Sequence, residues 1–417
     1  MTRTDGALVD DLLAPEVNAD PYPYFAELRE ADPVHWSERH QAWIVTRYDD
    51  VTAVLMDWKH FSSERVGPLL RAMDESAEPE AVAVMKMLNG WMVVTDPPVH
   101  KRLRRLAAKA FNPRRVAAKE GRIQELVDEL LDSFIESGSD RFVQDFAFPL
   151  PATVIAELIG APPEDTPRFK DWSDDLAQVA FGAGGDERND RYVRAMHGID
   201  ELFAYFEQRM EYSSENPGED MISDLLAGDG EGERLSDEEI KAMCALMLFA
   251  GHETTTTTIT SAILMLLRNP DQHERLRSEP DELAGPAVEE ALRYDGAIKV
   301  LIRYVTEDFE LRGRQIKAGQ RVFILPAAAN RDPERFENPE QVDIGRSPNP
   351  HVAFGKGIHA CIGAQLSRIE MRVALATIMK KMPDLRFAEA EPTLRYTPSL
   401  ASRALRELRI AYDGRES

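Results

Sequence analysis

The residues with the clearest chemical meaning lie in a glycine-rich loop near the C-terminal end of the chain. This loop reads Phe-Gly-Lys-Gly-Ile-His-Ala-Cys-Ile-Gly from Phe354 to Gly363, and it carries one of only two cysteines in 417 residues. Apolar residues recur after it at helical spacing, which predicts that Cys361 lies at the N-terminus of a helix. A helix N-terminus favours the thiolate and should lower the pKa of Cys361. One soft anionic ligand, beside glycines that allow close approach, suits haem iron.

Two other interpretations start from the same loop. A cysteine by itself is more often a small buried hydrophobic residue than a ligand. The run Gly355, Gly357 and Ala360 also mimics a dinucleotide-binding fingerprint, but the preceding residues are poor strand formers and no strand–helix–strand unit surrounds them. The two cysteines, Cys244 and Cys361, are too few for a disulfide framework or a structural zinc site.

A second group of chemically capable residues lies in the middle of a long helix that the sequence predicts over 236–268. Ser236 and Glu239 form a capping-box pattern at its start, and at 1.5 Å per residue the helix would extend about 45 Å. Its first half is apolar on most faces, which predicts a buried central helix. Gly251 and the five threonines at 254–258 are poor helix formers. Such a local inconsistency inside a buried helix indicates a functional site.

The elements that must position these two groups are mostly helical. Apolar residues recurring at three and four positions predict further helices over 21–31, 49–57, 98–110, 116–136, 151–159, 190–212 and 366–381. Short β-rich runs are predicted at 43–46, 302–305, 309–311, 321–325 and 408–411. These runs are too short and scattered for regular strand–helix alternation. The predicted fold class is therefore mainly α with a minor β part around one core.

The composition is typical of a soluble globular protein. The chain has 50 Lys and Arg against 73 Asp and Glu, a net charge of −23, and 43% hydrophobic residues. The first fifteen residues carry three Asp and no sustained apolar core, so they predict neither a secretion signal nor a membrane anchor. The longest apolar stretch, 242–251, is far shorter than the roughly 20 residues that span a bilayer. We therefore expect a cytoplasmic protein.

Taken together, the motifs resemble those of the cytochrome P450 family. The loop matches the haem-ligand pattern F-G-x-G-x-H-x-C-x-G at every fixed position. Three further family motifs follow the expected order: Ala-Gly-His-Glu-Thr-Thr at 250–255, Glu290-x-x-Arg293, and Asn-Arg-Asp-Pro at 330–333 with Phe336. The resemblance covers essentially the whole chain, and the length is similar to that of soluble bacterial members.

This resemblance implies a single domain over 1–417 with the cytochrome P450 fold. Haem b would be sandwiched between the long central helix and the helix that follows the cysteine loop. The β-rich portions would lie around 43–46, 302–325 and 394–412, and the helix-rich core over 98–293 and 361–382. By the same resemblance, Cys361 is the thiolate ligand of the haem iron, and a thiolate favours cleavage of the O–O bond of dioxygen.

Thr254 and Glu253 match the alcohol and acid pair of the family. Cleavage of the O–O bond requires protons, and a hydroxyl beside a carboxylate can position water and relay them. A threonine inside a helix otherwise donates to the carbonyl four residues earlier, here that of Ala250. We expect a partly unwound groove at Ala250 and Gly251 that leaves room for oxygen, and hence a catalytic role for the pair.

Several other residues are assigned to the cofactor by resemblance. Buried carboxylates such as haem propionates need cationic or N–H partners, and those implied are His100, Arg104, Arg303 and His359. Further contacts with the cofactor are implied for Phe354, Gly355, Gly363 and Ala250. Glu290 and Arg293, one helical turn apart, are expected to form a buried structural network. The alternative is an exposed pair worth about 0.3 kcal/mol.

The resemblance also implies a substrate pocket on the distal side of the haem. Its expected wall is Met85, Leu88, Trp91 and Val94 in a loop over 85–94, then Phe181, Leu246, Met247, Ala250, Ile298, Val300, Leu301 and Leu400. Such an apolar wall favours an apolar small molecule. Lys299 is the exception, and two interpretations stay open: it pairs with an acidic group of the substrate, or it points to solvent.

A basic window over 100–122 contrasts with the negative chain, because it holds nine Lys or Arg and a single acid, Glu120. It predicts docking of a small acidic electron carrier on the thiolate side of the haem, since complementary charge speeds encounter. The expected docking residues are Lys101, Arg102, Arg105 and Lys109. A nucleic-acid site is a second interpretation, but only Phe111 offers a stacking ring. A solvated basic helix is the third.

The predicted function is a monomeric haem-thiolate monooxygenase that inserts one oxygen atom from O2 into an apolar small molecule. Electrons would come from NAD(P)H through a separate reductase and ferredoxin. Two other functions stay open: a haem-thiolate protein that binds or senses a ligand without turnover, and a peroxide-driven peroxygenase. The intact Glu253 and Thr254 pair speaks against the first and favours the oxygen-dependent route over the second.

Overall fold

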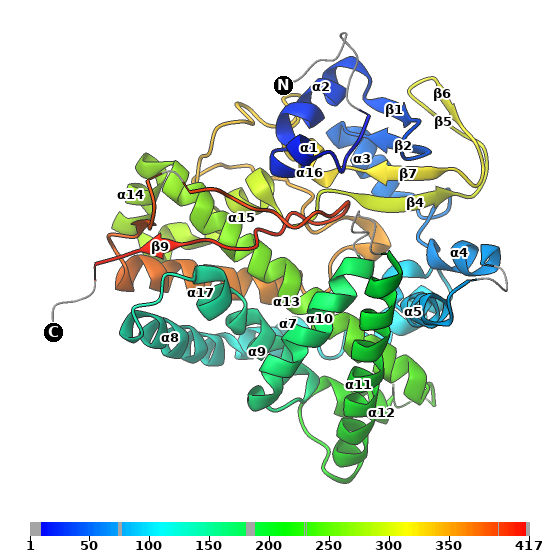
Figure 1. The fold of residues 1–417 in the computed structure, drawn as a ribbon, viewed down its shortest axis with the longest axis horizontal. Coiled ribbons are helices and arrows are strands. Elements are labelled where there is room, and N and C mark those ends of the chain that lie inside the picture. Colours follow the sequence, from blue (N-terminus) through cyan, green and yellow to red (C-terminus); the bar gives the residue numbers. More distant parts are fainter. Residues whose placement is uncertain are drawn as a thin grey trace.

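The computed structural model describes residues 10–73, 77–180, 188–228, 230, 232–390 and 392–413 (Figure 1). The α-helices are α1 (Pro15–Ala19), α2 (Tyr22–Ala31), α3 (Tyr48–Met56), α4 (Val66–Ala72), α5 (Pro79–Asn89), α6 (Val99–Ala107), α7 (Pro113–Ala118), α8 (Glu120–Glu136), α9 (Pro149–Ile159), α10 (Thr166–Ala180), α11 (Arg188–Glu215), α12 (Met221–Ala227), α13 (Asp237–Arg268), α14 (Pro270–Ser278), α15 (Pro280–Asp295), α16 (Pro326–Ala329) and α17 (Ala364–Lys381). Shorter helical turns are η1 (Met92–Val94), η2 (Val143–Ala147), η3 (Pro163–Asp165) and η4 (Gly357–His359). The strands are β1 (Val34–Ser37), β2 (Ala42–Val45), β3 (Phe61–Ser62), β4 (Leu301–Val305), β5 (Phe309–Leu311), β6 (Arg314–Ile316), β7 (Arg321–Ile324), β8 (Arg386–Phe387) and β9 (Ile410–Ala411).

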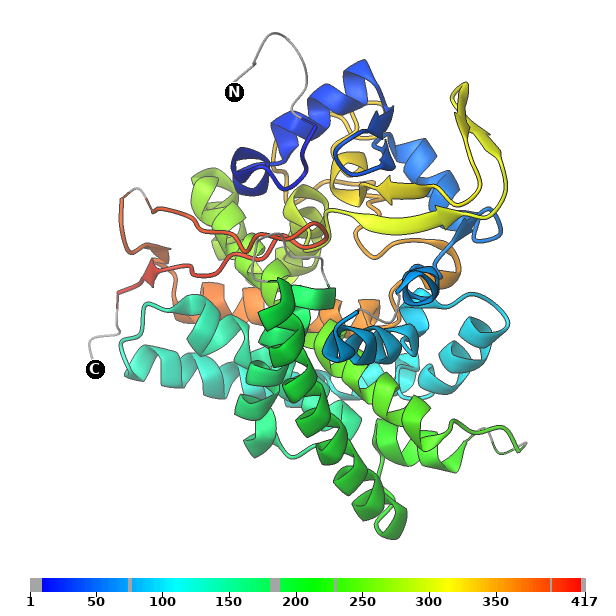
Figure 2. The same cartoon turned by 45° about the vertical axis from the view of Figure 1, so that its right-hand side comes forward.

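The main sheet lies at one side of the molecule with α1 and α2, away from the helices α8 to α12 (Figures 1 and 2). Its strand order is β1-β2-β7-β4-β3, with β2 and β7 parallel and the other neighbours antiparallel. Ile44 and Phe323 on neighbouring strands share a core with Phe25 of α2. The register sets Arg303, in the middle of β4, opposite Val322 of β7. The sheet thereby fixes the position of one predicted cofactor ligand.

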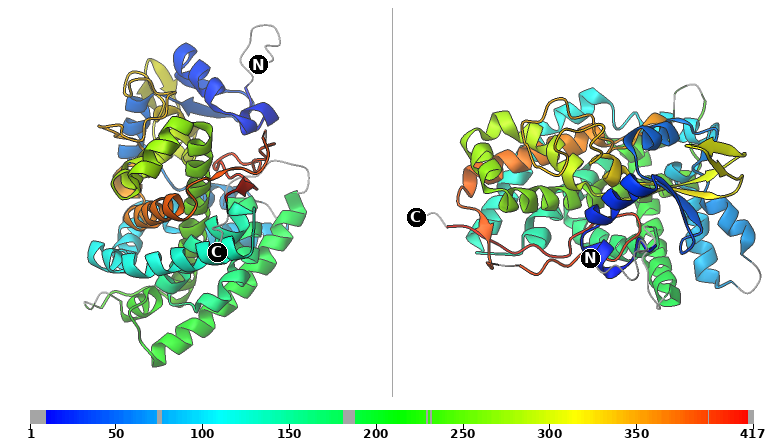
Figure 3. Two further views of the ribbon diagram at one scale, coloured as in Figure 1. Left: turned by 90° about the vertical axis from the view of Figure 1, so that its left-hand side faces the viewer. Right: turned by 90° about the horizontal axis from the view of Figure 1, so that it is seen from above.

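Helix α13 runs through the middle of the helical part as a continuous 32-residue helix (Figure 3). Its capping box is complete, because the Glu239 N–H donates to Ser236 Oγ at 3.2 Å and the Ser236 N–H donates to the Glu239 carboxylate at 2.9 Å. Helices α9, α15 and α17 pack around it. A Cβ on Gly251 would lie 2.6 Å from Cγ1 of Ile155, so the glycine lets α9 approach closely.

Helix α17 follows the cysteine loop and packs against α8, α13 and α15. It packs beside α13 and is the orange helix in both views of Figure 3. Its buried apolar residues include Leu366, Ile369 and Val373 at helical spacing. Since this apolar face must pack inward, the loop that precedes α17 is set against the middle of α13.

The predicted fold class is confirmed, while three details differ. Residues 79–89 form α5 rather than part of a loop, since Val84, Met87 and Leu88 are buried at helical spacing that the prediction overlooked. Helices α1, α4, α10, α12, α14 and α16 were not predicted. The C-terminal β portion is slight, with β9 and isolated bridges such as that of Tyr396 with Leu405. Within the described ranges, no helix has both the length and the apolar character needed to cross a membrane.

Candidate active site

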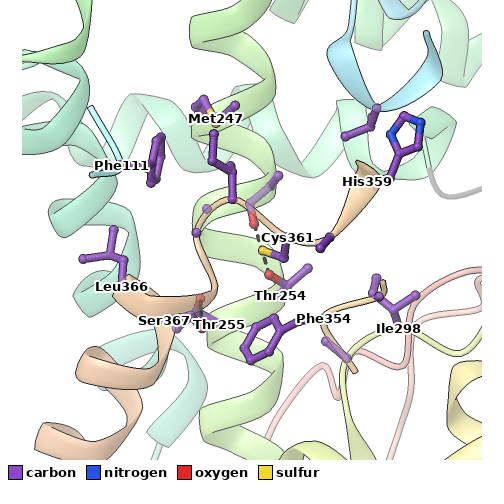
Figure 4. A pocket seen from close by; sticks show the side chains of 18 of the residues that line it. Phe111, Met247, Thr254, Thr255, Ile298, Phe354, His359, Cys361, Leu366 and Ser367 are labelled. Carbon is purple, nitrogen blue, oxygen red and sulfur yellow. Dashed lines mark hydrogen bonds between the residues drawn. The ribbon is translucent and has the colours of Figure 1, made fainter. Parts of the chain in front are cut away.

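A cavity of about 270 Å³ lies between α13 and the loop that carries Cys361 (Figure 4). Its wall comes from α13, from the cysteine loop with the start of α17, from residues 292–301, and from α6 with the residues just before it. Figure 4 shows Cys361 and Thr254 near its centre, with His359 on one side and Leu366 on the other. The wall is mainly apolar, so any charged group inside it is poorly solvated.

The cysteine loop, residues 354–363, has a tight conformation that requires glycine. Gly355 and Gly357 have φ values of +67° and +69°, which favour glycine. A Cβ on Gly357 would also lie 2.7 Å from the carbonyl oxygen of Leu55 in α3. The Cys361 N–H donates to the Phe354 carbonyl at 2.9 Å, which closes the loop. The sulfur of Cys361 therefore faces the cavity from a constrained backbone.

Burial raises the pKa of the Cys361 thiol, while the Gly363 N–H and the cations Arg104 and Arg368 act in the opposite direction. The prediction of a lowered pKa is therefore wrong. Helix α17 begins three residues beyond the sulfur, at Ala364, and the cost of placing a thiolate in an apolar cavity outweighs the favourable groups. A bound metal cation would reverse this balance, because a coordinating thiol is deprotonated outright.

Thr254 faces the same cavity from α13. Its Oγ1 donates to the Ala250 carbonyl at 3.0 Å, and the helix is continuous through Ala250 and Gly251. The prediction of an unwound groove is therefore wrong, because the threonine hydroxyl bonds within an intact helix and Gly251 serves the contact with Ile155. Glu253 is half-buried and does not contribute to the cavity wall.

Sequence reasoning missed a buried acid in the wall. Glu370 in α17 is 2% exposed, and its Oε2 has no hydrogen-bond partner among the described residues. Burial raises the pKa of Glu370 to about 8. Nearby, the hydroxyls of Thr255 and Ser367 lie 3.0 Å apart and join α13 to α17. The signal was present, since a glutamate lay within the apolar face predicted over 366–381.

Cationic and imidazole groups gather at the end of the cavity near His359. The ring centroids of His100 and His359 lie 4.2 Å apart. The Nε2 atom of His359 lies 2.9 Å from Oγ of Ser63. Arg104 donates to the Ala360 carbonyl at 2.7 Å. Burial lowers the pKa of His100 to about 4. It also lowers the pKa of Arg303, in β4, to about 10.

Arg65 belongs to this group and was missed by sequence reasoning, since a lone arginine outside any motif carries no signal. Burial lowers its pKa to about 10, and Arg65 and Arg303 lie close enough to repel one another. Neither guanidinium forms an ion pair within the described part of the chain, and the buried Nε2 of His100 lacks a hydrogen-bond partner there. The Asp96 carboxylate acts favourably on Arg303, but it accepts hydrogen bonds from Ser62 and Ser63. Cations without an ion-pair partner are costly in a protein interior. The residues therefore fit a group with two carboxylates, as haem has.

Glu290 and Arg293 lie in α15 with fully buried side chains, joined by bonds of 2.7 and 2.8 Å. Arg293 also donates to three carbonyls of the segment that precedes the cysteine loop, those of Asn330, Pro339 and Gln341. Glu290 accepts from Arg346 at 3.1 Å and from the Asp343 N–H at 2.9 Å. The network fastens α15 to the chain that leads into the loop.

Comparisons with known proteins decide the family. Residues 185–382 match the family model of cytochrome P450. The chain is 36% identical over 397 residues to the biotin biosynthesis cytochrome P450 of Bacillus subtilis (strain 168), across 94% of this chain and 96% of that protein. The chain belongs to the cytochrome P450 family. As a P450 it is an oxidoreductase, and the family cofactor is a haem bound through a thiolate, as the sequence predicts.

Solved structures agree with this P450 assignment. The structure of P450BioI with acyl carrier protein ligated to hexadec-9Z-enoic acid matches with a TM-score of 0.87 at 35% identity, over 95% of this chain and 100% of that chain. The structure of CYP109E1 from Bacillus megaterium with testosterone matches with a TM-score of 0.85 at 36% identity, over 95% of this chain and 99% of that chain.

The predicted substrate residues of this P450 divide into two groups. Those in the cavity wall are Leu246, Met247, Ala250, Ile298 and Leu301. Those outside it are Met85, Leu88, Trp91, Val94, Val300 and Leu400, and Phe181 lies outside the described residues. Trp91 stacks on Phe249 with ring centroids 5.6 Å apart, and Val300 is buried in the core beneath the sheet. Met92, Val93 and Ala297, which are neighbours of these residues in the sequence, contribute to the cavity wall instead.

Lys299 follows neither of the two interpretations left open by the sequence. It is 2% exposed and does not contribute to the cavity wall. Burial and the nearby Arg403 lower its pKa to about 8, while Asp295 acts in the opposite direction. Lys299 therefore lies in the protein interior, on the side of Asp295 and Arg403.

The basic window forms α6, α7 and the start of α8. Lys101 and Arg105 are exposed, while Arg102 and Lys109 are half-buried. Three of these four predicted docking residues contact the chain itself, as Arg102 pairs with Glu239, Arg105 pairs with Glu233, and Lys109 binds a backbone carbonyl. The docking of an electron carrier stays a prediction.

Proposed function

We propose that this P450 is a haem b monooxygenase that inserts one oxygen atom from dioxygen into a C–H bond of an apolar small molecule. One observation carries the proposal: the sulfur of Cys361 and the hydroxyl of Thr254 face one apolar cavity, beside the cations Arg65 and Arg303, which form no ion pair among the described residues. A thiolate, an apolar space and partners for two carboxylates are what haem binding requires. The two alternative functions would use the same haem-thiolate site, and the Glu253 and Thr254 pair favours the oxygen-dependent route over them.

In this proposal the chain holds the haem at both ends of the cavity. Cys361 binds the iron, and the propionates pair with His100, Arg104, Arg303 and His359 together with Arg65. The residues proposed to border the porphyrin are Phe354, Gly355, Gly363 and Ala250. When bound, the haem supplies the activation of dioxygen and the transfer of one oxygen atom.

Thr254 and Glu253 are proposed to deliver protons. The Thr254 hydrogen is directed to the Ala250 carbonyl at 3.0 Å, so the lone pairs of its oxygen stay available to hold a water molecule in the cavity. Glu253, the adjacent half-buried acid, would resupply protons from outside the cavity. The apolar wall around Thr254 excludes other water and thereby limits loss of the activated oxygen.

An apolar substrate is supported by the cavity and by related proteins. Leu246, Met247, Ile298 and Leu301 contribute apolar surface to the wall. The related P450BioI and CYP109E1 structures contain a fatty-acyl chain and testosterone, and both compounds are largely apolar. Electrons are proposed to come from NAD(P)H through a ferredoxin reductase and a ferredoxin that docks near Lys101, with the P450 acting as a monomer.

The test of this proposal is the spectrum of the reduced, carbon monoxide-bound protein. We expect the red-shifted Soret band of thiolate-ligated haem, and its loss in Cys361→Ala. Cys244→Ala is the matched control, because Cys244 is buried in α13 away from the cavity wall. Retention of the red-shifted band in Cys361→Ala would rule out this cysteine as the ligand.

A further inference from the structure

The basic face of α6 and α7 is partly occupied by an acidic segment of the same chain. We call this segment the acidic cover and define it by Asp224 in α12, Gly228 and Glu233 in the connection from α12 to α13, and Glu239 in α13. Gly228 has a φ of +66°, and a Cβ on it would lie 2.7 Å from the Glu233 carbonyl oxygen, so Gly228 and Glu233 lie close together.

Four contacts join the acidic cover to the basic face. They are Arg102 with Glu239, Arg105 with Glu233, Lys109 with the Gly228 carbonyl, and Arg115 with Asp224. Glu239 binds two nitrogens of Arg102, with Nη1 to Oε2 at 3.1 Å. Arg102 lowers the pKa of Glu239, so the carboxylate stays charged at neutral pH. The cover thus neutralises cations that an external partner would otherwise meet.

The basic face also lies over the cysteine loop. From the inner side of α6, Arg104 donates to the Ala360 carbonyl at 2.7 Å, directly before Cys361 in the chain. Arg102 and Arg105 project from the same helix toward the acidic cover. A carrier that docks on α6 would therefore approach the cavity from the side of the cysteine loop.

We propose that the acidic cover competes with the acidic electron carrier for Arg102 and Arg105, so that the carrier must displace it to dock fully. This inference rests on the proposed function. Carboxylates of a carrier can bind these guanidinium groups only where those of the cover leave. Lys101 and Arg114 are exposed and form no ion pair in the described part of the chain, so they offer the first contact. Full docking then exchanges an internal ion pair for an external one.

A pair of neighbouring glutamates provides a matched experiment. Glu239→Gln removes the charge opposite Arg102 but can keep the capping box, because glutamine also serves at this position. Glu238→Gln makes the same change of net charge one residue away, where the side chain is 74% exposed and pairs with Lys241 of its own helix. The measurement is the Kd of the haem-loaded protein for an acidic [2Fe–2S] ferredoxin at low and high salt.

We expect Glu239→Gln to bind this ferredoxin about two- to fivefold more tightly than Glu238→Gln at low salt, the range that an exposed ion pair supports. High salt should remove the difference. Glu233→Gln should act like Glu239→Gln without changing the helix cap. Hydrogen exchange should also become faster at residues 232–239 when ferredoxin binds. Equal affinities for all three variants, with unchanged exchange, would overturn the competition.

One further variant separates this inference from the proposed docking site. Lys101→Gln removes an exposed cation that has no partner in the acidic cover. If Lys101→Gln weakens ferredoxin binding while Glu239→Gln and Glu238→Gln bind equally, the docking site stands and the cover is overturned. If Lys101→Gln leaves binding unchanged, the carrier docks elsewhere and both ideas are overturned.

Discussion

The Thr254 hydroxyl donates a hydrogen bond to the Ala250 carbonyl within α13, and it also faces the cavity, where we propose that it helps to deliver protons. Thr254→Ala removes the hydroxyl, so proton delivery should fail while haem and substrate still bind. We expect the product formed per NAD(P)H consumed to fall at least about tenfold, with the electrons appearing as peroxide or water. Thr257→Ala is the control, because Thr257 is buried in the same helix but outside the cavity wall. An unchanged yield in Thr254→Ala would contradict the proton relay.

The buried Glu370 leads to a prediction of how the free energy of unfolding depends on pH. Burial raises its pKa from 4.5 to about 8, so the folded protein keeps this carboxyl neutral where the unfolded chain has ionised it. Its contribution to the free energy of unfolding is present below pH 4.5 and is lost as the pH rises toward 8. Glu370→Gln should remove this slope, which is measured by urea unfolding at several pH values. Parallel pH profiles for wild type and variant would contradict the assignment.

At the scale of elements, α13 can approach α9 closely because residue 251 is a glycine and has no side chain. Gly251→Ala would place a Cβ 2.6 Å from Cγ1 of Ile155, and overpacking of this kind costs about 1–3 kcal/mol. We expect lower stability in denaturant unfolding and a changed Soret spectrum, because Gly251 also borders the cavity. Ile155→Ala should lower the cost of Gly251→Ala in a double-mutant cycle. Additive effects would show that the two helices are not coupled at this contact.

At the scale of the whole molecule, the haem-free and haem-loaded proteins should respond oppositely to one substitution. Arg65 is a half-buried cation beside the buried Arg303, and neither forms an ion pair among the described residues. Arg65→Met removes this repulsion, so the haem-free protein should melt at a higher temperature than wild type. The haem-loaded variant should melt at a lower temperature, because it has lost a proposed partner of a propionate. Melting curves of both forms test this, and shifts of the same sign would contradict it.

Removal of the haem should also lower the stability of the wild type. A ligand that binds only the folded state stabilises it by about 2.7 kcal/mol at a hundredfold excess over its Kd. Here the cavity would lose packing, and the cations around His359 would lose their counter-ions. We therefore expect a lower melting temperature after haem extraction and recovery after haem is added back. Identical melting temperatures would argue against haem as the occupant of this cavity.

The sequence by itself determined the central helices and the resemblance to the P450 family. Apolar spacing predicts α13 and α17 to within a few residues, because a helix that is buried on one or more faces must carry its apolar residues periodically. The cysteine loop and the motif at 250–255 follow from chemistry that only certain residues can perform. The pairing of Glu290 with Arg293 follows from their separation by one helical turn.

Only the tertiary structure decided how residues distant in the chain meet. Arg65 lies beside Arg303, and Trp91 turns to Phe249 rather than to the cavity. The acidic cover reaches the basic face across more than a hundred residues. The pKa of Cys361 is likewise a property of its surroundings, since desolvation outweighs the favourable N–H and cations. Local periodicity specifies helices and strands, whereas burial and the pairing of charges on different elements arise only when the elements pack together.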